Sequence, residues 1–216
     1  MIDPLAERRA LKDRVLEAAL LHAAFDGWSR RTLIHAAHDV GLESSTARRL
    51  FPQGGDSLLG WLDDWADRRM LAAVERVDLA RLPVRRRIAL LVRARLEVLS
   101  PHREAVRRAV AARGMPANLG EGGRSLWRTV DLMWRTAGLG GSPAEGFAFY
   151  SRRATLAGVL ASTLLYWLGD QSEDASDSWA FLDRRVEDVM RIGRLRSTIE
   201  GWTTRLRGGG TAPVRG

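Results

Sequence analysis

The sequence predicts an all-α protein. Along its 216 residues, apolar side chains recur at intervals of three and four, the period of a helix with one buried face. Serine, glycine and proline stand between these segments at positions typical of helix starts and ends. No run alternates apolar and polar residues with the period of two that marks a half-buried strand. We therefore expect a helical bundle, with enough hydrophobic residues (45%) for a sizeable core.

The helices can be placed in order from these signals. An apolar face runs from Leu5 to Phe25, and this first helix is expected to end near Gly27. Thr32 is expected to cap the second helix and Gly41 to end it. The expected helices after the first cover residues 33–40, 44–51, 57–77, a segment opening at 83, a segment around 106–110, 123–137, 143–168 and a segment opening at 178.

The chain divides into four expected sections. These are an N-terminal helix-turn-helix-like domain over 5–55, a helical domain over 56–190, an amphipathic helix over 191–207 and a disordered tail over 208–216. The formal net charge of +8 is concentrated at the end of the chain, because residues 191–216 carry six arginines and one glutamate. Such an asymmetry suggests contact with nucleic acid or a membrane.

Composition excludes several classes of protein. There is no cysteine, which rules out disulfides, thiolate metal sites and cysteine nucleophiles. The N-terminus alternates acidic residues with arginine and has no apolar core, so we expect neither a signal peptide nor a transit peptide. The weakly polar run Ala154–Leu168 is shorter than the roughly 20 residues that a spanning helix needs.

Two short helices across a glycine turn predict a helix-turn-helix. Its packing residues are Leu33, Val40, Leu42 and Phe51. The pattern resembles the N-terminal domain of the tetracycline-repressor family over about residues 10–60. Arg48 and Arg49 stand where repressors carry aromatic residues, and the acidic residues Asp39 and Glu43 would repel DNA phosphates. We expect a retained scaffold without specific nucleic-acid binding, with a ligand-responsive regulator as the alternative.

The arginine-rich C-terminal segment predicts a membrane-associating helix. Its apolar residues, at spacings of three and four, are Ile192, Leu195, Ile199, Trp202 and Leu206. The arginines that flank this stripe are Arg191, Arg194, Arg196, Arg205 and Arg207. A narrow apolar stripe edged by arginines suits the membrane surface. The alternative is a helix packed back on the core with a solvated basic face.

Two apolar helices in the second half predict a binding face for a long apolar ligand. The candidate lining residues are Trp127, Val130, Trp134, Leu156, Leu160, Thr163, Leu164 and Trp167. The alternative is that these rows simply form core, because periodicity does not separate a filled interior from a pocket.

Catalytic and metal-binding signals are weak. His35 and His38 lie near one another on one expected helix but lack a third ligand, so we expect no metal site. No motif of a hydrolase, a zinc protease or a di-iron bundle occurs. We expect a binding protein rather than an enzyme, with no cofactor other than a bound lipid.

Three segments in the second half carry a more specific resemblance. They are Trp134–Gly138, Phe149–Ala154 and Trp179–Val186, in this order after the helix-turn-helix start. Over about residues 10–207 the chain resembles the COQ9 family of ubiquinone-biosynthesis accessory proteins. The resemblance implies a tetracycline-repressor-like fold that binds an isoprenoid or quinone lipid and uses its last helix at the membrane. It also implies delivery of the quinone intermediate to a di-iron hydroxylase.

The resemblance further implies roles for individual residues. Phe149, Tyr150 and Arg153 match the family's hydroxylase-contacting patch, with Phe149 in place of a tryptophan. The expected partners are the hydroxylase, the lipid, the membrane surface and a second copy in a homodimer. The expected location is the bacterial cytoplasm, on the inner face of the cytoplasmic membrane.

Overall fold

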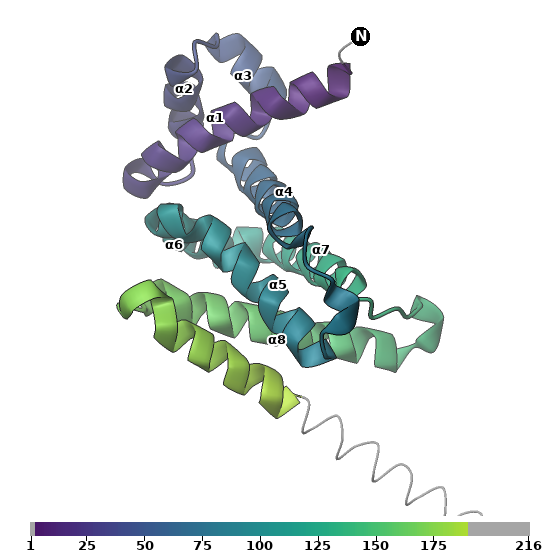
Figure 1. Cartoon of the computed structure of the whole chain (residues 1–216). Coiled ribbons are helices and arrows are strands. Elements are labelled where there is room, and N and C mark those ends of the chain that lie inside the picture. The colour runs from purple at the N-terminus through teal and green to yellow at the C-terminus, as the bar shows by residue number, and fades with distance from the viewer. Residues whose placement is uncertain (1–2, 190–216) are drawn as a thin grey trace, which may run out of the picture.

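The computed structural model describes residues 3–189. Its helices are α1 (Pro4–Asp26), α2 (Arg30–Asp39), α3 (Ser44–Leu50), α4 (Gly55–Val74), α5 (Val84–Leu99), α6 (Arg103–Arg113), α7 (Leu119–Thr136), α8 (Phe147–Gly169) and one over residues 176–189. No strand occurs within the described range, so the all-α prediction is confirmed. Figure 1 shows α1, α2 and α3 grouped at one end, while α4 leads into a second group formed by the later helices.

The first three helices form the expected helix-turn-helix unit, with one shift at a boundary. Ser29 caps α2 in place of Thr32, because Ser29 Oγ accepts the backbone N–H of Thr32 at 3.2 Å. The Thr32 hydroxyl instead donates to the carbonyl oxygen of Gly27 at 2.6 Å and is fully buried. Gly27 itself has φ +71°, a left-handed value that favours glycine. The turn between α1 and α2 is thus fixed by the side chains of Ser29 and Thr32.

Close contacts join this unit to the rest of the molecule. The indole N–H of Trp28 donates to the carbonyl oxygen of Ala105 in α6 at 2.9 Å. Gly55 opens α4 so close to Trp28 that a Cβ at position 55 would lie 2.4 Å from the Trp28 carbonyl oxygen. Only glycine allows this approach, so the start of α4 is held against the α1–α2 turn.

A buried ionic network organises the second group of helices. Arg95 of α5 is 6% exposed and donates through Nε to Asp67 at 2.8 Å and through Nη2 to Asp63 at 3.1 Å. Burial alone would lower the pKa of Arg95, but the two carboxylates outweigh it and raise that pKa. Burial raises the pKa of Asp67, and its bonds to Arg95 only partly offset this. Arg95 therefore stays charged between two acids of α4.

The same two acids also bind α6 and α7. Asp63 accepts hydrogen bonds from Arg113 of α6 and from the hydroxyl of Ser125 of α7. Asp67 accepts a hydrogen bond of 2.8 Å from the hydroxyl of Thr129, which lies one turn further along α7. Four helices thus meet at two neighbouring carboxylates of α4.

A second polar cluster ends α8 and starts the last described helix. The Asp170 carboxylate accepts hydrogen bonds from the backbone N–H groups of Ser172 and Ser178, each at 2.8 Å. It also accepts hydrogen bonds from the hydroxyls of both serines. Burial opposes ionisation of Asp170, but these hydrogen bonds hold its pKa below its usual range. Arg103 of α6 donates to the Asp170 carbonyl oxygen at 2.6 Å, so the corner is also tied to α6.

Several expected boundaries shift, and some expectations fall on residues that the structure does not describe. α7 begins at Leu119 instead of residue 123, and α4 covers Gly55–Val74 instead of 57–77. Within the described range, no helix is both long and apolar enough to cross a membrane. The expected membrane helix over 191–207 and the tail over 208–216 lie outside the described residues.

We predict that Arg95→Met lowers the free energy of unfolding by about 3 to 5 kcal/mol, because it removes the buried counter-charge of Asp67 and leaves Asp63 with Arg113. Urea unfolding followed by circular dichroism measures the change. Arg86→Met is the matched control, since Arg86 is exposed on the same helix, and it should shift stability by less than about 0.5 kcal/mol. Similar losses in both variants would contradict a dominant role of the network.

Candidate functional site

The packed pair α7 and α8 carries the predicted lipid-contacting residues. α7 is strongly amphipathic, and α8 is apolar along most of its length. The buried members of the predicted set are Val130, Leu156, Leu160, Thr163 and Trp167. The half-buried members are Trp127, Trp134 and Leu164. The fold therefore brings the two rows together, and most of their side chains also belong to the hydrophobic core.

Two polar atoms on the buried face of α8 lack hydrogen-bond partners. Among the described residues, neither Thr163 Oγ1 nor Trp167 Nε1 has a partner, although both residues are 0% exposed. They are four residues apart, so they lie on the same face of the helix. The other buried polar and charged side chains of the described chain all form hydrogen bonds. Because an unpaired buried donor costs about 1 to 3 kcal/mol, this pair calls for an explanation.

The surroundings of Trp167 are basic. The Arg103 guanidinium lies over the Trp167 ring, 4.5 Å from its centroid. Arg107, one turn further along α6, donates to the carbonyl oxygen of Leu168. Two arginines of α6 therefore border the C-terminal end of the α8 face.

At the other end of α8, Arg153 forms a buried aromatic and ionic cluster. Its side chain is 2% exposed, and its Nε donates to Asp131 of α7 at 2.8 Å. The guanidinium lies 3.5 Å from the ring centroid of Phe149 and 5.8 Å from that of Trp134. Arg153 thus links α7 to α8 by charge and by contact with aromatic rings.

Tyr150 is the exposed member of the predicted partner patch. It is 51% exposed, whereas Phe149 is 9% exposed. Its ring stacks on Trp127 of α7 with centroids 5.9 Å apart, and it meets Phe149 edge to face at 5.1 Å. Phe147 nearby is 75% exposed. The structure therefore places Tyr150 on the surface, with Phe149 and Arg153 beneath it as supports.

Asp131 is a residue of this cluster that sequence reasoning missed. It receives Arg153 from α8 and also pairs with Arg135 on its own helix at 2.8 Å. The available signal was a single acid within the apolar row Val130, Leu132 and Met133. A carboxylate at such a position needs a cationic partner, but the sequence does not say which of many arginines supplies it.

A polar cleft of about 230 Å³ lies apart from this face, and the sequence did not predict it. Its lining residues come from the start of α4, the end of α6 and the start of α7: Gln53, Asp56, Leu59, Gly60, Arg113, Asn118, Gly120, Glu121, Arg124 and Ser125. Basic and acidic side chains are mixed there, so the cleft does not favour a ligand of one charge.

The architecture defines a class of protein. A helix-turn-helix start followed by a larger helical group is the fold of tetracycline-repressor-type (TetR) regulators. A TetR transcriptional regulator from Nitrosomonas europaea ATCC 19718 matches with a TM-score of 0.67 and 22% identity, over 82% of this chain and 97% of that one. Another from Rhodococcus sp. RHA1 gives a TM-score of 0.60 and 15% identity, over 84% and 95%. At these identities the likeness concerns the fold alone.

The sequence relatives narrow the class further, and the chain belongs to the COQ9 family. The COQ9 family model matches residues 119–193, which include α7 and α8. The ubiquinone biosynthesis protein COQ9, mitochondrial, is 32% identical both in Rattus norvegicus and in Homo sapiens, over 92% of this chain. The chain spans 66% and 64% of the length of these two relatives. The resemblance inferred from the sequence is therefore confirmed.

These comparisons correct the expected location. We expected the bacterial cytoplasm, at the inner face of the cytoplasmic membrane. The relatives from Rattus norvegicus, Homo sapiens, Drosophila melanogaster and Dictyostelium discoideum are all named mitochondrial proteins. They point to mitochondria, so the bacterial assignment was wrong. The assignment rested on the missing leader pattern together with the family resemblance.

We predict that Arg153→Met lowers the free energy of unfolding by about 2 to 4 kcal/mol, because it leaves Asp131 short of a buried partner and removes the contact with Phe149. The neighbouring variant Arg152→Met is the control, since Arg152 is 53% exposed and pairs with Glu145 at the surface. Chemical denaturation compares the two. Equal stabilities would place Arg153 outside the structural core of the site.

Proposed function

We propose that this protein is a lipid-binding accessory protein of ubiquinone biosynthesis. It holds an isoprenoid or quinone intermediate at the α7–α8 face and presents it to the di-iron quinone hydroxylase. The names of the COQ9 relatives support the pathway. The observation that carries the binding role is the pair of unpartnered donors, Thr163 and Trp167, within an otherwise apolar face.

The proposed ligand suits this face in two ways. An isoprenoid tail is stabilised by about 0.8 kcal/mol for each CH₂ removed from water, and its exchange with acyl chains is close to neutral. A quinone carbonyl or phenol oxygen at its head can accept hydrogen bonds from Trp167 Nε1 and Thr163 Oγ1. The protein contributes burial and orientation, and the chemistry belongs to the partner enzyme.

Tyr150 is the proposed point of contact with the hydroxylase. An exposed aromatic side chain fixed by stacking loses little conformational freedom on binding, and tyrosine is enriched at interface hot spots. Phe149 and Arg153 act beneath it as positioning residues. In the same proposal, the arginine-flanked segment 191–207 contacts the membrane surface, as its sequence pattern favours.

A ligand-responsive regulator is the second candidate, because α3 exposes Arg48 and Arg49 at the surface of the helix-turn-helix. Such a regulator binds a particular duplex tightly and with a steep dependence on salt. A lipid carrier shows only weak and nonspecific affinity for DNA.

We predict that Thr163→Val and Trp167→Phe each reduce binding of a quinone intermediate by roughly 5- to 10-fold, the value of one lost hydrogen bond. Lipid-free Thr163→Val keeps or gains stability, because valine has the shape of threonine without the unpaired donor, whereas Trp167→Phe also removes side-chain volume from a fully buried position. Native mass spectrometry of bound lipid and thermal unfolding of delipidated protein measure the two effects. The control is Thr155→Val, since Thr155 is exposed on the same helix and donates to the Ser151 carbonyl oxygen. Gains in stability with unaltered lipid binding would assign the face to core packing alone.

We predict that Tyr150→Ala weakens binding to the hydroxylase by about 30-fold, as expected for a hot spot worth about 2 kcal/mol. Isothermal titration calorimetry with the purified hydroxylase measures the affinity. Tyr166→Ala is the matched control, because Tyr166 is an exposed tyrosine near the other end of α8, where it stacks on Phe181. An unchanged affinity for Tyr150→Ala would remove this residue from the interface.

A further inference from the structure

The C-terminal half of α1 and the body of α2 carry two matching pairs of histidine and aspartate. His22 and Asp26 are four residues apart on α1, and His35 and Asp39 are four residues apart on α2. Residues at this spacing share one helix face. Because α1 and α2 pack against each other in a hairpin, the two pairs meet crosswise. His22 faces Asp39, and His35 faces Asp26.

Three of these side chains converge closely. His22, Asp26 and His35 each offer a ligand atom, and these atoms all lie within 4.8 Å of one another. The two imidazole rings are 5.4 Å apart at 62°, and His35 Nδ1 lies 3.9 Å from Asp26 Oδ2. In a tetrahedral zinc site with bonds of 2.0–2.2 Å, ligand atoms stand roughly 3.3 Å apart. Small side-chain rotations close the remaining distance, since all three residues reach the surface.

The fourth residue, Asp39, prepares His22 for metal binding. His22 Nε2 lies 2.6 Å from Asp39 Oδ2, which is hydrogen-bond distance. In the tautomer that donates this hydrogen bond from Nε2, the lone pair of His22 Nδ1 is available to a metal ion. A carboxylate that orients a ligating imidazole in this way is a common outer-shell partner in zinc sites.

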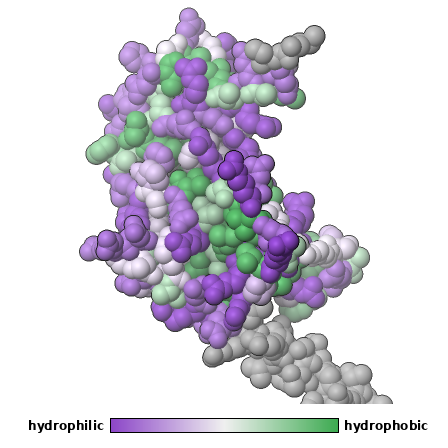
Figure 2. All heavy atoms as spheres, in the orientation of Figure 1, coloured by the Kyte–Doolittle hydropathy of each residue, from purple (hydrophilic) through white to green (hydrophobic). Residues whose placement is uncertain are grey.

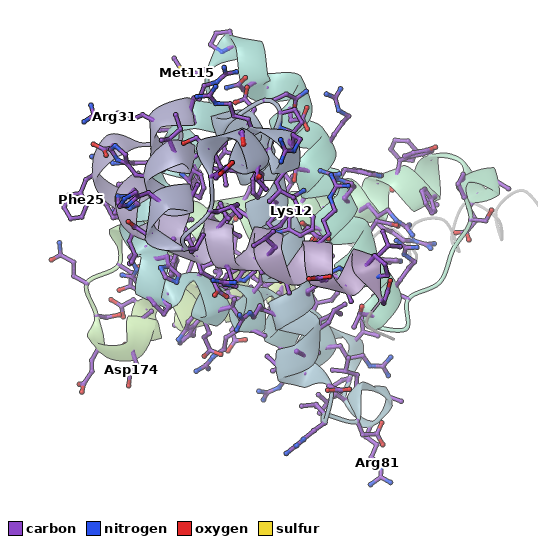
Figure 3. The ribbon with its side chains drawn as sticks, turned by 90° about the horizontal axis from the view of Figure 1, so that it is seen from above. Lys12, Phe25, Arg31, Arg81, Met115 and Asp174 are labelled. Atoms are coloured by element: carbon purple, nitrogen blue, oxygen red, sulfur yellow. The ribbon has the colours of Figure 1, made fainter. Side chains whose placement is uncertain are left out.

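The helix backbones that carry the ligands are held in place. The facing residues of α1 and α2 beneath the cluster are fully buried: Ala19, Ala23, Leu33, Ala36 and Ala37. The Thr32 hydroxyl ties the turn between the helices at Gly27. Figure 3 shows this end of α1, where Phe25 points outward from the ribbon. The four side chains therefore project from a rigid frame, which lowers the cost of organising a site.

We propose that His22, Asp26 and His35 bind one divalent transition-metal ion of the Zn²⁺ type, with a solvent molecule completing the coordination. Two nitrogen ligands and one carboxylate favour Zn²⁺ and similar ions over Mg²⁺ and Ca²⁺, which prefer oxygen. The ion bridges α1 and α2 and braces the hairpin of the helix-turn-helix unit. This site is independent of the proposed lipid function, because it lies on α1 and α2, away from the α7–α8 face.

The test uses the full chain without an affinity tag. Zn²⁺ is titrated by calorimetry at pH 7.5 in a buffer that does not chelate metals, and Co²⁺ is added separately to report tetrahedral coordination by its visible absorption. At free Zn²⁺ about 100 times the Kd, we expect the Tm to rise by roughly 5 to 10 °C.

Four variants separate a built site from surface histidines. His22→Gln and His35→Gln each remove a ligand, and we expect losses of affinity of roughly 100-fold or more together with loss of the Co²⁺ bands. Asp39→Asn removes the outer-shell carboxylate and should cost about 10- to 100-fold. His38→Gln is the matched control: His38 is also on α2 and its side chain is 92% exposed, and although it lies 3.9 Å from Asp39 it is not one of the three converging ligands.

The outcomes are distinct. Binding that His38→Gln preserves and that His22→Gln and His35→Gln abolish supports the site, provided that circular dichroism without metal shows all variants folded. Zn²⁺ binding that survives in both ligand variants, or that is lost equally in His38→Gln, overturns it. Absence of any Zn²⁺-dependent heat and Tm shift in the wild-type chain overturns it as well.

Discussion

The buried contact of Arg95 with Asp63 and Asp67 is the constraint on which the second group of helices depends. A guanidinium that is 6% exposed must keep its counter-charges, and both lie on α4. The same carboxylates also receive donors from α6 and α7. Sliding α5, α6 or α7 along α4 would leave at least one charge or hydroxyl buried without a partner. The network thus selects one register of the bundle, whatever its net contribution to stability.

That register determines what α7 presents to α8. With Ser125 and Thr129 turned toward α4, the opposite side of α7 offers Asp131 and Trp134 to α8, where Arg153 completes a second buried ion pair. Arg153 in turn supports Phe149 and the exposed Tyr150. Figure 2 shows hydrophobic side chains gathered near the middle of one face and bordered by hydrophilic ones, as expected when polar links surround an apolar interior.

Sequence reasoning succeeded where local periodicity decides the outcome. It predicted the helical class, the helix-turn-helix and the rows on α7 and α8, because each depends on spacing within one segment. It placed the cap of α2 at Thr32, since Ser29 and Thr32 are equally suitable by composition and only the tertiary turn at Gly27 selects Ser29. It treated Arg153 as a surface contact, because burial of one arginine among many depends on Asp131, 22 residues earlier. It paired His35 with its neighbour on the same helix, whereas the fold pairs it with His22 of α1.

The contrast between these ionic networks and the face of α8 is informative about function. In the described chain, the buried side chains Asp63, Arg95, Arg153 and Asp170 all have hydrogen-bond partners, so the fold satisfies even its most costly groups. The neutral hydroxyl of Thr163 and indole N–H of Trp167 are easier to pair than these charged groups, yet neither donor has a hydrogen-bond partner among the described residues. At position 163, a valine would fill the same space without the cost of an unpaired donor. Under the proposed function, the acceptor arrives with the ligand, because an oxygen-bearing head on an apolar tail matches two donors within an otherwise apolar face.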